Sequence, residues 1–211
     1  MELINEFLKS FFNLTKSFFL TGGNALSLYY FNHRMSEDLD CFTTEREEFE
    51  HLSGILDEVC KITGINLKSE RVFPNFRRYL LSKNEESILV DFVYEPVRQI
   101  YPEKKIINGV RVDVPEEMTI NKLCALLGRS DFKDLVDLFY LQKSGFCAID
   151  YVAKAEEKEG GLNSATLAYV LRGMGISKMP ENLKKSVSPE ELEKFKENLI
   201  QDLLKTALPK K

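Results

Sequence analysis

Two glycines and two aspartates near the start of the chain form a pattern that suits phosphate chemistry. The pair Gly22-Gly23 follows an apolar run, and Asp38 and Asp40 lie one residue apart in the next apolar stretch. Because successive side chains of a strand alternate between its faces, both carboxylates would point the same way, and we expect Leu39 and Phe42 in the core. Two carboxylates on one face repel each other unless a cation lies between them, and oxygen ligands suit Mg²⁺.

The glycine pair also precedes a helical pattern that begins at Asn24. Backbone N–H groups at the start of a helix bind anions, most naturally a phosphate. A Walker-type phosphate loop is excluded, because no Gly-Lys-Ser or Gly-Lys-Thr follows the glycines. Glycine pairs and acidic pairs are each common in ordinary turns and solvated loops. Their combination predicts metal-dependent phosphoryl or nucleotidyl transfer, with Gly22, Gly23 and Asn24 around the phosphates.

A third carboxylate, Asp91, interrupts the apolar run Ile88–Tyr94. A carboxylate inside a buried strand is costly unless it is paired or ligated. Transfer chemistry with two metal ions needs ligands on both ions, so Asp91 is a candidate metal ligand or general base. The alternative is that Asp91 pairs with an arginine of the neighbouring strand, Arg77 or Arg78.

The elements that would position these groups belong to a mixed α/β domain followed by helices. Helical spacing of apolar residues predicts helices over residues 2–16, 24–31 and 45–63, and strands are predicted over 17–21, up to 43, 65–73, 76–82, 87–94 and, as a hairpin, 106–114. After Pro115 the pattern is helical, with breaks at 128–131, 144–146 and 160–163 and a last helix from Ser188 to Ala207. We therefore predict an α+β domain over residues 1–114, with a small mixed sheet, and a helical domain over residues 115–211.

Composition places the chain among ordinary globular proteins. Of its 211 residues 44% are hydrophobic and 29% charged, and the net charge of −4 excludes a generally basic nucleic-acid-binding protein. The four cysteines show no metal-binding spacing, so we expect reduced core residues and no zinc site. The first residues lack the basic start of a signal peptide, and no apolar run reaches membrane-spanning length. We expect a cytoplasmic protein without a membrane partner.

Two sequence blocks carry a family resemblance. The first is Leu20-Thr21-Gly22-Gly23-Asn24-Ala25-Leu26 with His33-Arg34-Met35-Ser36-Glu37-Asp38-Leu39-Asp40. The second is Lys122-Leu123-Cys124-Ala125-Leu126-Leu127-Gly128-Arg129 with Lys133-Asp134-Leu135-Val136-Asp137-Leu138. Both blocks, in this order, resemble the AbiEii/AbiGii toxin family of the polymerase-beta-like nucleotidyltransferase superfamily. That family includes toxins of type IV toxin–antitoxin and abortive-infection systems.

The resemblance implies a polymerase-beta-like core and a Mg²⁺-dependent transfer of a nucleotide from an NTP, with Mn²⁺ as the alternative ion. It suggests an RNA acceptor such as the 3′ end of tRNA, and a cognate antitoxin as partner. By matching position it also implies active-site roles for Lys122 and Asp137.

The side chains of these blocks have definable tasks. Arg34 and Ser36 are candidates to contact phosphate oxygens, although Arg34 could instead pair with Glu37 or Asp38. Lys122 would neutralise the triphosphate, with a solvated surface lysine as the alternative, and we expect its replacement to weaken nucleotide binding without comparable loss of stability. Asp134 and Asp137, three apart on one helix, could hold Lys122 or Arg129 in place or face the substrate, and Arg129 is a further candidate nucleotide ligand.

An RNA acceptor would need a local basic patch. Its candidates are Arg71, Arg77, Arg78, Lys83, Lys104, Lys105 and Arg111. Two other functions stay open at this point: transfer to a small molecule, such as an antibiotic, or to a protein, and a catalytically silent nucleotide-binding or antitoxin-binding regulator. Three mutually repelling carboxylates argue against the silent regulator.

Overall fold

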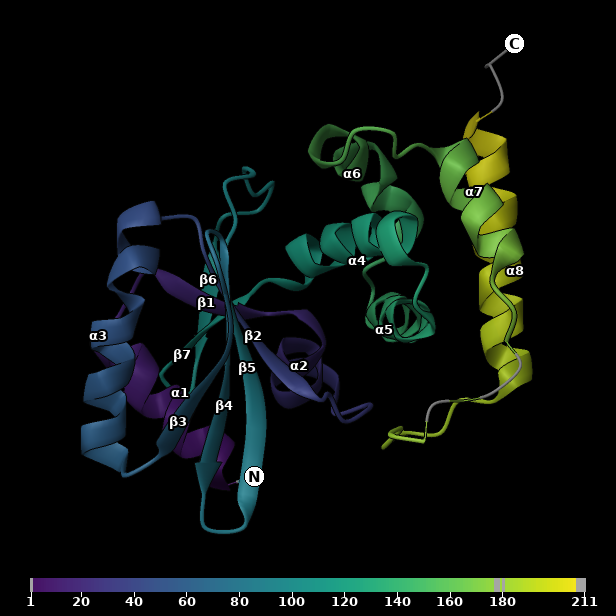
Figure 1. Cartoon of the computed structure of the whole chain (residues 1–211). Coiled ribbons are helices and arrows are strands. Elements are labelled where there is room, and N and C mark those ends of the chain that lie inside the picture. The colour runs from purple at the N-terminus through teal and green to yellow at the C-terminus, as the bar shows by residue number, and fades with distance from the viewer. Residues whose placement is uncertain (1, 177–178, 180, 208–211) are drawn as a thin grey trace. The chain divides into compact units, whose positions relative to one another are not determined.

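The computed structural model describes residues 2–176, 179 and 181–207 of the chain, which form two compact units (Figure 1). Unit 1 comprises Met1–Tyr30, Ser36–Arg98 and Glu103–Val114, and unit 2 comprises Phe31–Met35, Gln99–Pro102 and Pro115–Lys211. The short segments 31–35 and 99–102 thus group with the C-terminal helices, whereas the sequence pattern places them within residues 1–114. The division into two domains stays a prediction.

Unit 1 is built on a seven-stranded mixed sheet with the order β3-β4-β5-β2-β1-β7-β6. The strands are β1 (Phe18–Thr21), β2 (Asp38–Thr43), β3 (Asn66–Phe73), β4 (Phe76–Lys83), β5 (Glu86–Tyr94), β6 (Lys104–Ile107) and β7 (Val110–Asp113). β1 and β7 are parallel, as are β2 and β5, and the other neighbouring strands are antiparallel. The predicted mixed sheet is confirmed. Its central strand is β2, which carries Asp38 and Asp40, and β1, which leads into the glycine pair, lies beside it.

Two helices, α1 (Glu2–Leu14) and α3 (Arg46–Thr63), cover one face of this sheet (Figure 1). Aromatic packing holds α1 there: the Phe11 ring lies 5.3 Å from the rings of both Phe18 and Phe92. Buried aromatic pairs of this kind add stability beyond the area they remove from water. The opposite face carries α2 (Gly22–Ala25), which continues as a π-helix over Leu26–Phe31.

The core of unit 1 follows the alternation of its strands. In β2, Leu39 and Cys41 are fully buried, while Phe42 is half-buried on the same face as Asp38 and Asp40. The expectation that Phe42 lies in the core was therefore wrong, because residues two apart in a strand share a face.

From Pro115 onwards unit 2 is mainly helical, in agreement with the periodicity of this part of the sequence. Its helical elements are α4 (Pro115–Arg129), α5 (Phe132–Lys143), a 3₁₀ turn (Ala148–Tyr151), α6 (Val152–Lys158), α7 (Ser164–Gly173) and α8 (Pro189–Ala207). The break between α4 and α5 is short because Asp131 caps α5, its side chain accepting a hydrogen bond from the Lys133 N–H. In the described part of the chain, every helix is too short or too polar to cross a membrane.

Candidate active site

Three carboxylates meet on the face of the sheet opposite α1 and α3. Asp40 pairs in register with Asp91 across β2 and β5, and Asp38 lies two residues before Asp40 on the same side. One oxygen from each of the three side chains lies within 4.8 Å of the other two. Oxygen atoms so spaced can bind one divalent cation together, and their chemistry fits Mg²⁺ or Mn²⁺. This convergence is what the sequence pattern requires of a metal site.

Gly22 allows α2 to begin directly beside this cluster. Its φ of +70° is a left-handed conformation that other residues rarely adopt, and a Cβ atom built there would overlap the Asp40 carboxylate. The neighbouring Asn24 is buried, and its side-chain amide donates to the backbone oxygen of Asp38. The glycine turn and β2 are thereby fixed to each other.

Arg78 of β4 pairs with two carboxylates of the cluster. Its Nε and Nη2 donate to the two carboxylate oxygens of Asp91, at 2.6 and 2.5 Å, and Nη2 also lies 3.4 Å from Asp38 Oδ2. The hydrogen bond to Asp91 raises the pKa of Arg78. The pairing of Asp91 with an arginine, the alternative given by the sequence, is therefore present together with the carboxylate cluster.

A buried ion pair next to β1 could not be found from the sequence. Asp113 of β7 is fully buried, accepts a hydrogen bond from the Thr21 hydroxyl at 2.8 Å and pairs with Lys104 at 3.0 Å. Thr21 immediately precedes Gly22 and pairs in register with Asp40. Asp113 thus fixes the residue from which the glycine turn starts, a contact between segments ninety-two residues apart that no local pattern reveals.

The second sequence block forms a different cluster, inside unit 2. The Lys122 ammonium lies 2.7 Å from Asp134 Oδ1 and 2.6 Å from Asp137 Oδ2, and both aspartates are fully buried. Lys122 is itself only 5% exposed. Arg129 closes the cluster by donating two hydrogen bonds to Asp134, at 2.8 and 2.9 Å, and its side chain stays 53% exposed.

Residues 31–35 complete this cluster. Arg34 donates from Nε and Nη2 to the two oxygens of Asp137, at 2.7 and 2.8 Å, and His33 Nε2 lies 2.7 Å from Asp137 Oδ1. The sequence suggested Glu37 or Asp38 as the partner of Arg34. The structure instead pairs Arg34 with Asp137, which lies more than a hundred positions away in the chain. His33, which is fully buried, was not singled out by the sequence. Its position beside Arg34 in the first block was the available signal.

The charges of this cluster support one another. Burial opposes the charge on Lys122, but Asp137 and Asp134 outweigh burial and raise the pKa of the ammonium. Burial likewise acts against ionised Asp137, yet the Lys122 charge and the hydrogen bonds from Arg34 and His33 hold the pKa of Asp137 well below its usual range. The pKa of Asp134 is lowered in the same way, against burial, chiefly by the hydrogen bond from Arg129 and the charge of Lys122.

The remaining predicted residues divide between the two units. Ser36 is half-buried and belongs to unit 1, whereas Arg34 belongs to unit 2. The basic residues expected to form one RNA-facing patch are not on one face: Arg77 lies over the Phe49 ring of α3, on the face opposite Arg78. Lys83 binds Glu6, which also removes it from such a patch.

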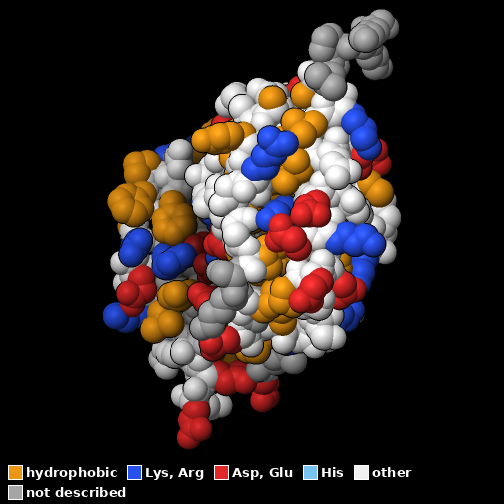
Figure 2. Space-filling model, turned by 90° about the vertical axis from the view of Figure 1, so that its right-hand side faces the viewer, with side chains coloured by type: hydrophobic (Ala, Val, Ile, Leu, Met, Phe, Trp, Pro, Cys, Tyr) orange, Lys and Arg blue, Asp and Glu red, His pale blue; other side chains and the backbone are white. Residues whose placement is uncertain are grey.

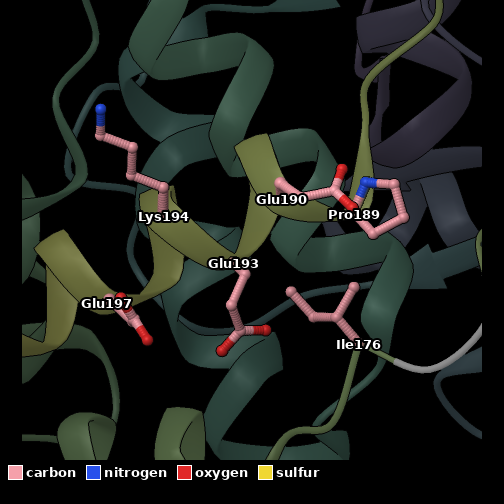
Figure 3. Close-up of a pocket in the computed structure, with 6 residues that line it drawn as sticks. All are labelled: Ile176, Pro189, Glu190, Glu193, Lys194 and Glu197. Atoms are coloured by element: carbon pink, nitrogen blue, oxygen red, sulfur yellow. The ribbon is translucent and has the colours of Figure 1, made fainter.

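A pocket of 390 Å³ lies along α8 (Figure 3) and contains no residue of either cluster. It is lined by Ile176, Pro189, Glu190, Glu193, Lys194 and Glu197. In Figure 3 Glu193 lies beside Ile176, and Lys194 extends to the opposite side of the helix. Glu193 pairs with Lys196 at 2.6 Å. On the face drawn in Figure 2, acidic and basic side chains are interspersed, which is typical of a solvated surface.

Comparison with known proteins identifies the family. The model of the "Nucleotidyl transferase AbiEii toxin, Type IV TA system" family matches residues 6–209. The chain belongs to this family. Membership in the AbiEii family makes the chain a nucleotidyltransferase and confirms the resemblance seen in the two sequence blocks. No curated protein sequence matches the chain.

Solved structures show the same fold at low sequence identity. A Helicobacter pylori protein assigned as a nucleotidyltransferase has a TM-score of 0.66 and 21% identity, over 97% of this chain and 93% of its own. MenT4, a nucleotidyltransferase toxin of Mycobacterium tuberculosis, has a TM-score of 0.60 and 16% identity, over 98% of this chain and 82% of its own. The chain therefore shares the fold of these two proteins over nearly its whole length.

Proposed function

We propose that the chain is a cytoplasmic toxin that transfers a nucleotide from an NTP to an RNA acceptor such as the 3′ end of tRNA, and that a cognate antitoxin restrains it. The observation that carries this proposal is the convergence of Asp38, Asp40 and Asp91 within 4.8 Å beside the Gly22 turn. Family membership supplies the reaction class, and the carboxylates supply the means to perform it.

Each group near the triad has a defined task in this proposal. Asp38 and Asp40 would hold a divalent cation, Mg²⁺ or Mn²⁺, and Asp91 would add a ligand or accept the proton of the acceptor hydroxyl. When bound, such a cation would supply positive charge to offset the charge on the departing pyrophosphate. The backbone N–H groups of Gly22, Gly23 and Asn24 orient phosphates of the NTP.

The unit 2 cluster contributes in another way. Lys122 and Arg34 are buried and engaged by Asp134 and Asp137, so we infer that these four side chains fix the cluster. The Arg129 side chain is 53% exposed even though it binds Asp134, so it is the cation of the cluster that a phosphate in solution can most readily approach. The expected direct contact of Lys122 with the triphosphate is thereby replaced by a positioning role.

The acceptor has a candidate surface on the same face of the sheet as the triad. Arg71 pairs with Arg78 across β3 and β4, and two residues further along Phe73 pairs with Phe76, with ring centres 6.3 Å apart. Phe73 is 58% exposed. Exposed aromatic rings beside an arginine stack the bases of single-stranded nucleic acid, which favours an RNA end over a small molecule as the acceptor.

The test is to incubate the chain with Mg²⁺, total RNA and each NTP labelled at the α- or the γ-phosphate, with Asp40→Asn as the inactive control. Label from the α-phosphate should enter RNA, and label from the γ-phosphate should not. Transfer of γ-label, or label found only on protein or small molecules, would contradict the proposal. Phe73→Ala should raise the KM for RNA while leaving the KM for the NTP unchanged.

A further inference from the structure

A guanidinium already lies at the acidic triad. Arg78 occupies both oxygens of Asp91 through bonds of 2.6 and 2.5 Å, and approaches Asp38 at 3.4 Å. Strand register fixes this position, because Arg78 pairs with Asp91 across β4 and β5, and Asp91 pairs with Asp40 across β5 and β2. Arg78 therefore points to the same face of the sheet as the oxygens that would hold a cation.

The guanidinium engages oxygens that a metal ion would need. Arg78 carries one positive charge and pairs with Asp91 and Asp38, two of the three carboxylates of the cluster. A bidentate arginine pair is among the stronger side-chain interactions, and it takes the same lone pairs that a metal ion would use. A divalent cation that enters the cluster would therefore compete with Arg78 for these oxygens.

We propose that Arg78 is a built-in counterion that competes with the divalent metal for Asp91 and Asp38, and so sets the metal affinity of the site. The inference rests on the proposed metal binding by the triad. The proposal predicts the sign of the change in metal affinity when Arg78 is replaced. Removing a competing cation strengthens metal binding, whereas removing a merely structural residue leaves metal binding unchanged or weakens it.

The experiment is a titration of the full chain with Mn²⁺, without nucleotide, in which electron paramagnetic resonance measures the free ion. Arg78→Met removes the charge and keeps much of the side-chain volume. Arg77→Met is the matched control, because Arg77 is the next residue of β4 but faces α3, where it lies over the Phe49 ring and contacts Ser53. Asp40→Asn marks binding at the triad.

We expect Arg78→Met to bind Mn²⁺ about tenfold more tightly than the wild type, the effect of removing one screened unit charge a few ångströms away. Arg77→Met should match the wild type, and Asp40→Asn should lose the binding. If Arg78→Met binds equally or more weakly while Asp40→Asn still loses binding, the competition is refuted and the metal site stands. If Asp40→Asn binds Mn²⁺ like the wild type, the proposed metal site itself fails.

A second variant keeps the test decisive if Arg78→Met does not fold. Arg78→Lys retains the positive charge near buried Asp91 but cannot form the bidentate pair. It should tighten Mn²⁺ binding in the same direction, by less than Arg78→Met. Equal or weaker binding by a folded Arg78→Lys protein would overturn the proposal.

Discussion

The chain contains two clusters of aspartates whose surroundings are opposite. On the sheet of unit 1, Arg78 pairs with Asp91 and Asp38 of the triad, and the Asp38 side chain is 31% exposed. Inside unit 2, Asp134 and Asp137 are fully buried and are met by Lys122, Arg34, Arg129 and the ring of His33. The first cluster is partly open to solvent, and the second is enclosed together with its buried cations Lys122 and Arg34.

This difference separates two roles that look alike in the sequence. Carboxylates that solvent can reach can accept a cation from outside, which suits a reacting site. Carboxylates compensated by buried cations have no such capacity, and removing one of them leaves unpaired charges inside the protein. We therefore assign metal binding to the triad and a supporting role to the unit 2 cluster.

Asp40→Asn is expected to give the largest effect, because it tests the reacting role assigned to the triad. It should reduce metal-dependent transfer by at least about 100-fold, the scale of losing one electrostatic stabiliser in an active site. Stability should stay the same or rise slightly, because one of three repelling charges is removed. Asp57→Asn, an exposed aspartate of α3, is the control for both assays. Loss of folding in Asp40→Asn would show that the triad is a structural cluster as well.

Asp137→Asn should have the reverse profile. It should lower the free energy of unfolding by about 3–5 kcal/mol, the cost of breaking a buried ion pair, because Lys122 and Arg34 keep their charges without this partner. Urea denaturation followed by circular dichroism measures the change. Asp131→Asn, on the same helix, should be nearly neutral because asparagine also caps helices. A stable but inactive Asp137→Asn protein would instead place Asp137 in the reaction.

Gly22→Ala tests whether the glycine turn depends on its closeness to the triad. Gly22 and Gly64 have almost the same positive φ, +70° and +69°, but a Cβ at Gly64 meets nothing within 4 Å. Both alanine variants should lose about 1 kcal/mol or more of stability from the unfavourable φ. Only Gly22→Ala should also weaken Mn²⁺ binding, since its methyl group displaces the Asp40 carboxylate. Equal Mn²⁺ affinities of the Gly22→Ala and Gly64→Ala proteins would show that the close approach of Gly22 to Asp40 does not matter for metal binding.

The pH dependence of stability gives the smallest expected effect. The pKa values of Asp134 and Asp137 are lowered in the folded state, so the stability they contribute is complete above the ordinary aspartate pKa of about 4 and is lost as pH falls below it. The difference in unfolding free energy between wild type and Asp137→Asn should therefore shrink between about pH 4 and pH 2. A difference that stays constant over that range would contradict the proposed ionisation.

Local patterns were sufficient for the elements and for the aspartate pair of β2. The strand alternation of β2 predicted Asp38 and Asp40 on one face, because strand periodicity is a local property, whereas the register that brings Asp91 beside Asp40 joins two strands that are distant in the chain. The partners of Arg34 and Thr21 could not be predicted, since Asp137 and Asp113 lie 103 and 92 residues away. The burial of Lys122 was missed for the same reason: its stripe of leucines indicates a helix but not which carboxylates face its ammonium.

The most direct test of the account is the location of a bound metal. A crystal of the full chain soaked in Mn²⁺ and measured at a wavelength where manganese scatters anomalously would show the ion as a density peak. We expect a peak among the carboxylates of Asp38, Asp40 and Asp91, at about 2.0–2.4 Å from the ligating oxygens, and none between Asp134 and Asp137. A peak at the unit 2 aspartates, or no peak at the triad, would contradict the assignment.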